Sequence, residues 1–164
     1  MKNDILFKKT KIENHTLNSI EFRNSSFTMY DIVFGMIANF TPTTLGGRKR
    51  LQDWKRKISI QIKSARKSIQ NPDKIYAITI GMKFHPLTHG NQKFDLDNYS
   101  KPIIDAIAAG LFCDDDEDLS ILTEYNKFDD SNFQHIYLER LPDVDTSQDE
   151  SIIILVSQKS LNPI

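Results

Sequence analysis

The residues of this chain with the clearest chemical potential are two alternating aspartates, Asp95 and Asp97, and the Lys101 that follows them. On an extended segment, side chains two residues apart point to the same side, so the two carboxylates would lie close together. Like charges at that distance repel each other unless a cation lies between them. Oxygen ligands suit a hard divalent ion, and Mg²⁺ is usually held by one or two carboxylates while it keeps waters for a substrate phosphate. The pair therefore predicts a Mg²⁺ site, with Mn²⁺ as the expected substitute.

A second acidic cluster, Asp114 to Asp118, follows some twenty residues later. It lacks the glycine and the closing glutamate of a calcium-binding loop, so that type of site is excluded. An apolar segment of helical character separates the two acidic groups. Proline is tolerated in a first helical turn, so Pro102 predicts that this helix begins near Lys101. This order of elements can return the late carboxylates to the early pair.

The patterning of apolar residues predicts the elements that must position these groups. The expected strands are Phe27–Phe40, Ile75–Phe84, Leu119–Phe128, Phe133–Leu138 and Ser151–Val156. Together with two main helices, they indicate an α/β or α+β fold with a small mixed sheet. We expect residues 1–26 to form an N-terminal extension with a short strand or two, and residues 27–164 to form a single domain. An acidic loop is expected over Pro142–Glu150.

The clearest predicted helix follows Gly47, with apolar residues from Leu51 to Ile69 recurring at spacings of three and four. Such spacing places them on one face of a helix. The other face is basic although the net charge of the chain is only −1, so positive charge is concentrated here. A basic face can be a solvated surface, but a local basic footprint is also what phosphate binding needs. The predicted DNA-binding residues are Arg48, Lys49, Arg50, Lys55, Arg56 and Lys63.

The central block reads Asp95-Leu96-Asp97-Asn98, then Lys101, Asp105-Ala106-Ile107, Gly110, and Asp115-Asp116 before Leu119. In these residues the chain resembles the RusA-type Holliday junction resolvases, whose signature fixes the same residue types at similar offsets. The resemblance spans roughly thirty positions and implies that residues 27–164 form a RusA-like nuclease domain. Outside the block, only the order of elements is similar.

The resemblance implies roles for these residues. Asp95, Asp97 and one late aspartate would bind the metal, and Lys101 would assist catalysis. Counting back from Leu119 selects Asp116 as the third ligand, whereas a shorter spacing from Gly110 selects Asp115; we take Asp116 and keep Asp115 as its neighbour. The resemblance further implies branched DNA as the substrate and a homodimer, because a symmetric dimer places two identical sites for paired nicks.

Other features exclude several functional classes. No apolar run is long enough to span a membrane, and the polar N-terminus does not resemble a secretion signal, so we expect a cytoplasmic protein. The lone Cys113 agrees with a reducing compartment and is expected to be a buried packing residue. His85 and His89 have no further ligands at zinc spacing. We expect no nucleotide cofactor.

Two alternatives remain open from the sequence. The same metal site could act on flaps, other branched DNA or plain duplex, because substrate shape is read by loops and dimer geometry. The chain could also bind DNA through the basic helix without cutting it. In that reading, Asp97 or Asn98 would be a helix N-cap and the late acidic run a solvated loop.

Overall fold

The computed structural model describes residues 3–8, 30–38, 48–66, 76–83, 96–128, 131, 133–141 and 150–159. These residues contain five strands, two long helices and one short 3₁₀ helix. The strands are β1 (Asn3–Lys8), β2 (Tyr30–Ala38), β3 (Tyr76–Lys83), β4 (Phe133–Arg140) and β5 (Ser151–Lys159). The helices are α2 (Arg48–Arg66), α4 (Leu96–Phe112) and the 3₁₀ helix η3 (Leu119–Ile121).

The described strands form one mixed sheet in the order β1-β2-β5-β3-β4. Only β3 and β4 pair in parallel, and the other neighbours are antiparallel. A parallel pair needs a crossover connection, and α4 lies between β3 and β4 in the chain. The expected mixed sheet with two main helices is therefore confirmed. One short strand, β1, lies within residues 1–26 and pairs with β2, whereas the division at residue 26 stays a prediction.

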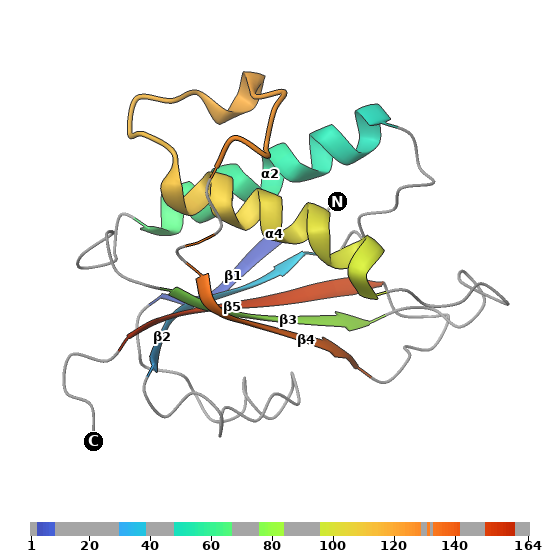
Figure 1. Cartoon of the computed structure of the whole chain (residues 1–164), viewed down its shortest axis with the longest axis vertical. Helices are drawn as coiled ribbons and strands as arrows, with labels where there is room; N and C mark the ends of the chain where they lie inside the picture. The colour runs from blue at the N-terminus through green and yellow to red at the C-terminus, as the bar shows by residue number, and fades with distance from the viewer. Residues whose placement is uncertain are drawn as a thin grey trace, which may run out of the picture.

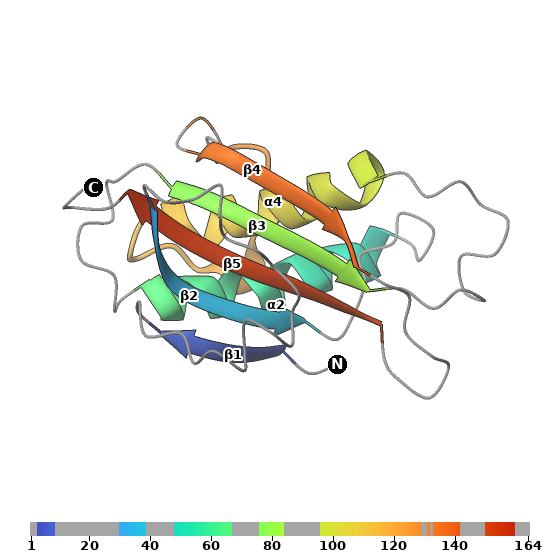
Figure 2. The same ribbon diagram turned by 90° about the horizontal axis from the view of Figure 1, so that it is seen from below.

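Both long helices cover the same face of the sheet (Figure 1). Seen from the opposite side, the strands lie in front of both helices (Figure 2). The core between the two layers contains the apolar face of α2, with Trp54, Ile58 and Ile62 fully buried. The helix predicted from these residues is thus confirmed. No helix in the described part of the chain has the length and apolar character needed to cross a bilayer.

Helix α4 is buried on nearly all sides, because α2, the sheet and the segment after α4 surround it. Its residues from Pro102 to Leu111 are apolar or small apart from Asp105, as expected of a helix inside a core. Small residues let α2 approach closely: a Cβ built on Gly110 would lie 2.6 Å from the Cβ of Ile62. The second half of α4 therefore lies directly against the second half of α2.

The two helices run in the same direction. Lys55 of α2 lies beside Asp105 of α4, and Arg66 at the end of α2 binds the carbonyl of Leu111 near the end of α4. Both helices consequently begin at one end of the helical layer, the right-hand end in Figure 1. The partial positive charges of two helix N-termini point to that end.

Two predictions about local structure were wrong. The strand expected over Leu119–Phe128 is the 3₁₀ helix η3 followed by an irregular segment. Its apolar residues recur every third position, at Leu119, Leu122, Tyr125 and Phe128, and not every second position as in a strand. Three of them, Leu119, Leu122 and Tyr125, pack with Ala109 and Cys113 of the α4 end in a second, smaller core, and Phe128 packs against it.

The other wrong prediction concerns the start of α4. This helix begins at Leu96, five residues before the expected start at Lys101, and Pro102 lies inside it. The ring of Pro102 is buried, so tertiary packing compensates for the helical hydrogen bond that a proline cannot donate. Asp97 is consequently a helical residue, whereas the sequence predicted an extended one.

Candidate active site

The predicted catalytic residues that the structure describes begin at the first turns of α4. Residues 97, 101 and 105 are spaced by four, so they follow one face of the helix. Asp95 lies outside the described residues. Asp97 therefore does not lie on an extended segment, although it keeps its one-turn spacing from Lys101.

Lys101 is the predicted catalytic residue whose surroundings are best defined. Its side chain is 75% exposed, and its Nζ lies 3.9 Å from Oδ1 of Asp105. The other oxygen of Asp105 lies 3.7 Å from Nζ of Lys55, and both of these side chains are only 17% exposed. The Asp105 carboxylate thus lies between the partly buried cation of Lys55 and the exposed cation of Lys101. The exposed ammonium group of Lys101 is therefore only loosely paired.

A pocket of about 520 Å³ opens at this position. It is lined by Leu51, Gln52 and Lys55 of α2, by Lys101 and Asp105 of α4, and by residues 123–126. The Gln52 side chain donates a 2.8 Å hydrogen bond to the carbonyl of Thr123, which ties the returning segment to α2. The pocket brings groups from three distant parts of the chain around Lys101.

Burial makes Lys55 different from a surface lysine. Removal from water lowers the pKa of Lys55 below its usual value, although the nearby Asp105 carboxylate acts in the opposite direction. Its Nζ also lies 5.1 Å from the ring centre of Tyr125, within the range of a cation–π contact. The prediction that Lys55 binds DNA has not been tested, but in this structure its partners are Asp105 and Tyr125.

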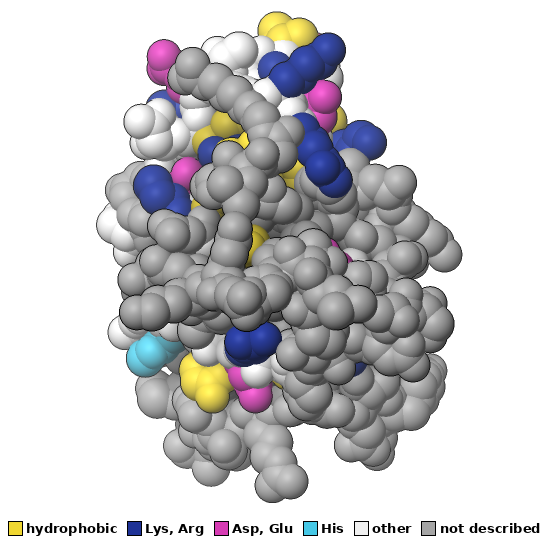
Figure 3. Space-filling view, turned by 90° about the vertical axis from the view of Figure 1, so that its right-hand side faces the viewer, with side chains coloured by type: hydrophobic (Ala, Val, Ile, Leu, Met, Phe, Trp, Pro, Cys, Tyr) yellow, Lys and Arg dark blue, Asp and Glu magenta, His cyan; other side chains and the backbone are white. Residues whose placement is uncertain are grey.

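The other predicted DNA-binding residues fall into two groups along α2. Lys49 and Arg50 are exposed in its first turn, and the side chain of Arg48 lies outside the described part. Arg56 instead binds the carbonyl of Leu122 and pairs with Asp53. Figure 3, viewed from the end where both helices begin, shows Lys and Arg side chains gathered over the helical layer. Among the predicted DNA-binding residues whose side chains the structure describes, the exposed ones are Lys49 and Arg50.

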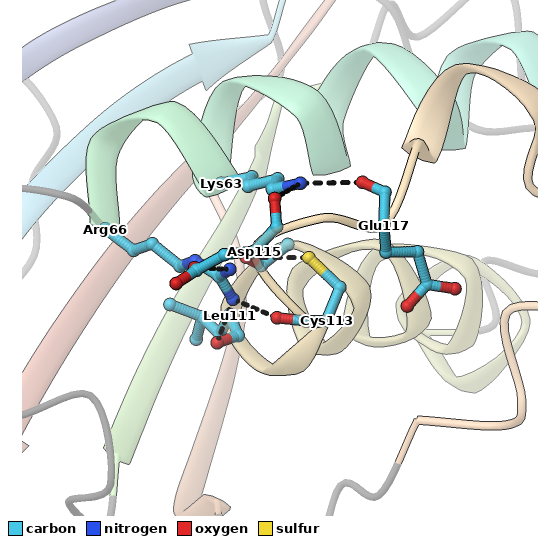
Figure 4. A network of polar contacts seen from close by, with 7 residues as sticks. Lys63, Arg66, Leu111, Cys113, Asp115 and Glu117 are labelled. Carbon is cyan, nitrogen blue, oxygen red and sulfur yellow. Dashed lines mark hydrogen bonds and ion pairs between the residues drawn. The ribbon is translucent and has the colours of Figure 1, made fainter.

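Lys63 and Arg66, near the end of α2, hold the end of α4 (Figure 4). Arg66 donates hydrogen bonds to the carbonyls of Leu111 (2.9 Å) and Cys113 (2.6 Å), and Lys63 donates to the carbonyl of Glu117 (2.6 Å). The last carbonyls of a helix have no partner within it, and α4 has no basic residue in its own last turn. A guanidinium group from another helix supplies that partner here.

The late aspartates lie at this end of α4. Asp115 accepts a 2.8 Å hydrogen bond from Arg66, and its backbone carbonyl accepts another from Lys63. Asp116 is exposed. Asp118 is the N-cap of η3, and its side chain accepts hydrogen bonds from Ser120. These hydrogen bonds lower the pKa of the Asp118 carboxyl. Cys113 is buried, as predicted, and burial raises the pKa of its thiol.

The late aspartates lie far from position 97 along α4. Among the residues that the structure describes, no three His, Cys, Asp or Glu side chains come together as metal ligands. At about 1.5 Å per residue, position 97 and Phe112 are about 22 Å apart along α4. Asp115 is anchored beyond Phe112. The structure therefore brings Lys101 to position 97 but leaves the late aspartates at the other end of the helix.

Sequence reasoning missed three parts of this region. One sequence feature could have indicated the pairing of Lys55 with Asp105. Asp105 follows Lys101 by four residues, and a carboxylate on that helix face attracts cations. The position of Glu124 in the pocket depends on how the segment after η3 returns. The role of Arg66 depends on carbonyl groups about fifty residues away in the chain.

Comparisons with known proteins agree with the motif. No curated protein and no solved structure matches the chain. The family model described as Endodeoxyribonuclease RusA matches residues 41–139, which is more than half of the chain. The matched region contains α2, α4, the pocket and both acidic groups. The chain therefore belongs to the RusA endodeoxyribonuclease family.

Proposed function

We propose that this protein is a metal-dependent endonuclease that resolves Holliday junctions and related branched DNA in recombination and repair. The observation that carries the proposal is the family match over residues 41–139, because every predicted catalytic and DNA-binding residue lies inside it. The open pocket around Lys101 supports the same assignment, since it lies next to the helix turn that contains Asp97.

The first turn of α2 is the proposed contact with the DNA backbone. Lys49 and Arg50 are exposed there, and the N-terminus of α2 adds backbone donors and a partial positive charge. Both helices begin at this end, so a phosphate bound to α2 lies toward the same side as Lys101. Backbone contacts of this kind give affinity without reading the base sequence.

Lys101 is the proposed stabiliser of negative charge at the reacting phosphate. Its ammonium group is exposed and only loosely paired with Asp105 at 3.9 Å, so it can exchange that partner for a phosphate oxygen. Lys55, on the other side of Asp105, prevents that carboxylate from carrying an unbalanced charge. A bound Mg²⁺ or Mn²⁺ ion would supply a water of lowered pKa and neutralise charge on the phosphoryl oxygens.

We also propose that the active form is a homodimer. A four-way junction has a two-fold axis that relates strands of like polarity, and its resolution needs a nick in each of two strands. An isologous dimer presents two copies of one site related by the same kind of axis. Such an arrangement explains paired nicks without a second kind of active site.

The test is cleavage of a labelled synthetic four-way junction with Mg²⁺, Mn²⁺ or EDTA, with linear duplex and a flap as competitors. The Asp97→Asn protein is the matched control, because this change removes one charge and keeps the size of the side chain. We expect symmetric paired nicks in the junction with either ion, and loss of cleavage in EDTA and in the variant. Junction binding should remain, because removal of a negative charge does not weaken phosphate contacts.

Three results would contradict the proposal or a part of it. Near-normal cleavage by Asp97→Asn would remove this residue from the metal site. Tight binding of the junction with no cleavage in any divalent ion would instead identify a DNA-binding protein that uses the basic end of α2. Equal cleavage of junction, flap and duplex would keep the nuclease and refute the specificity for branched DNA.

A further inference from the structure

The pocket beside Lys101 is larger than contact with a single phosphate requires. Its volume is about 520 Å³, and it lies between α2, α4 and residues 123–126. Pockets of this size hold whole organic ligands. The Lys101 side chain is 75% exposed, whereas those of Lys55 and Asp105 are only 17% exposed. The pocket therefore extends from an accessible cation to groups that are largely removed from water.

The charges that line the pocket balance each other. Two lysines, Lys55 and Lys101, face two carboxylates, Asp105 and Glu124. The Asp105 carboxylate lies 3.7 Å from one ammonium group and 3.9 Å from the other. A phosphate inside the pocket would therefore meet a carboxylate as well as the cations, and like charges repel. A neutral ligand that has both hydrogen-bond donors and acceptors suits this lining better.

Apolar groups form another part of the lining. Leu51 and Tyr125 both line the pocket, and Tyr125 is buried. The Nζ of Lys55 lies 5.1 Å from the centre of the Tyr125 ring. The lining thus combines apolar and aromatic surface with polar groups. A flat aromatic ring with donors and acceptors along its edge has the matching character.

Gln52 adds an acceptor whose orientation is fixed. Its amide nitrogen donates a 2.8 Å hydrogen bond to the carbonyl of Thr123, which identifies the other atom of the amide as the oxygen. This oxygen is buried and has no hydrogen-bond partner among the described residues. An unpaired buried acceptor costs free energy. A ligand that brings N–H groups into the pocket can remove this cost.

We propose that the pocket receives one unpaired nucleobase, from the nucleotide next to the reacting phosphate. This inference rests on the proposed function, because Lys101 then contacts the phosphate while the base attached to the same sugar enters the pocket. Lys55 and Asp105 present a donor and an acceptor side by side, as the edge of a base requires. Their separation of 3.7 Å is longer than an ordinary hydrogen bond, so both groups can bind a ligand.

Branched DNA is the substrate from which a base leaves its pair most easily. Removing a base from a duplex costs a few kcal/mol in unpairing and unstacking, and the cost is least for a base that is already poorly paired. The pairs at a branch point lack a continuous stack on one side. Entry of a base into the pocket therefore favours a branch point over plain duplex.

A fluorescent base tests this proposal without cleavage. The probe is a four-way junction that carries 2-aminopurine at one branch-point nucleotide at a time, mixed with the full chain in EDTA. This base emits more strongly when it leaves the stack. We expect emission to rise at the nucleotide next to the cleaved bond and at no nucleotide within the duplex arms. Unchanged emission at every branch-point nucleotide would overturn the inference.

A bulky side chain at the rim of the pocket tests where the base goes. Thr123 is exposed and lines the pocket, and Thr123→Trp fills space there while the backbone carbonyl that Gln52 binds remains. Lys127→Trp adds the same ring at an exposed position outside the lining and is the matched control. We expect the emission rise to disappear in Thr123→Trp and to remain in Lys127→Trp. An equal rise in both would overturn the pocket as the site.

Cleavage of a junction without the base supplies the second measurement. Single-turnover rates with Mg²⁺ are compared for the intact junction and for one with an abasic nucleotide next to the cleaved bond. We expect the abasic junction to be cut about 10-fold more slowly by the wild type, because the contribution of the base is lost. Thr123→Trp should cut both junctions at one reduced rate. A wild type that cuts both at equal rates would overturn the inference even if Thr123→Trp does not fold, which circular dichroism shows.

The outcomes separate this inference from the function on which it rests. Absence of junction cleavage by the wild type in any divalent ion would refute the nuclease, and the emission measured in EDTA would still decide whether a base enters the pocket. Equal cleavage of the intact and abasic junctions, with no emission rise, would overturn the base pocket and leave the nuclease intact.

Discussion

At the start of α4, Lys101 and Asp105 are 3.9 Å apart and line an open pocket, with Lys101 75% exposed. At the end of the same helix, Arg66 is 9% exposed and makes three hydrogen bonds of 2.6–2.9 Å. Both ends bring basic and acidic side chains together. At the start of α4, the charged side chains are loosely paired and accessible. At the end of α4, Arg66 instead binds backbone carbonyls and the Asp115 carboxylate.

This difference shows how residues of one type divide between function and structure in this protein. A charged side chain that satisfies buried carbonyls cannot leave them without loss of stability. An exposed, loosely paired one can exchange its partner for a phosphate at little cost. The contrast supports the proposed substrate contact at the start of α4, and it identifies Arg66 and Lys63 as structural anchors at the end of that helix.

The largest effect is expected from Lys101→Ala. Loss of a cation that stabilises a reacting phosphate should slow junction cleavage by about 100-fold or more. The melting temperature (Tm) should hardly change, because this side chain is exposed and its ion pair is weak. Single-turnover cleavage and thermal unfolding measure the two effects. Lys57→Ala, at another exposed lysine of the helical layer, is the control. An equal loss of cleavage in this variant would contradict a specific role of Lys101 at the start of α4.

Arg66→Ala should show the opposite pattern, with stability as the first loss. Removal of the guanidinium group leaves the carbonyls of Leu111 and Cys113 without their donor, at a cost of about 2–5 kcal/mol in the free energy of unfolding. Urea denaturation gives this value. Arg66→Lys keeps the charge and should lose less. An Arg66→Ala protein as stable as the wild type would show that the network is not an anchor.

Gly110→Ala sharpens the description of the anchored half of α4. The new Cβ would lie 2.6 Å from the Cβ of Ile62 and 2.8 Å from the carbonyl oxygen of Ser59, so the helices must move apart. Overpacking of this kind costs about 1–3 kcal/mol. Helix propensity alone would stabilise the variant by roughly 0.5–1 kcal/mol. The sign of the change in unfolding free energy therefore shows whether overpacking or helix propensity has the larger effect. Ser64→Ala, at an exposed position of α2, serves as the control.

The smallest effect is expected at the surface of the same region. Lys127 pairs with Glu117, and Lys127 is 45% exposed. Such pairs contribute only about 0.2–1 kcal/mol, and salt screens them. Lys127→Ala should therefore lower the Tm slightly at low ionic strength and not at all in 1 M salt, at which the Debye length is about 3 Å. A loss of stability as large as that of Arg66→Ala would contradict the distinction between buried and exposed pairs.

Much of the fold could be predicted because apolar periodicity is a local signal. The spacing of Trp54, Ile58 and Ile62 predicted α2, and the apolar runs predicted β2, β3 and β5. The segment from Leu119 to Phe128 was misread as a strand because its period of three was not recognised. The start of α4 was misplaced because the known cost of an internal proline was given more weight than packing around Pro102.

The site was only partly predictable, for a physical reason. Residue types and spacing selected Lys101 and the acidic groups as candidates, because a family motif is a pattern in the sequence. The same types could not show that Arg56 and Lys63 bind carbonyls of a segment more than fifty residues away. Spacing also could not show how far position 97 lies from the late aspartates, because that distance depends on a continuous helix from Leu96 to Phe112.

The most direct test compares two neighbouring residues, Asp115 and Asp116, by replacing each with Asn and measuring Tm and junction cleavage on the same proteins. Asp115→Asn should lower the Tm only slightly, because the Asp115 carboxylate that pairs with Arg66 is itself fully exposed, and should keep cleavage. Asp116→Asn should keep the Tm and lose cleavage. The reverse pattern, or equal effects of the two substitutions, would contradict the division of α4 and its neighbouring segment into a structural anchor and a metal-binding group.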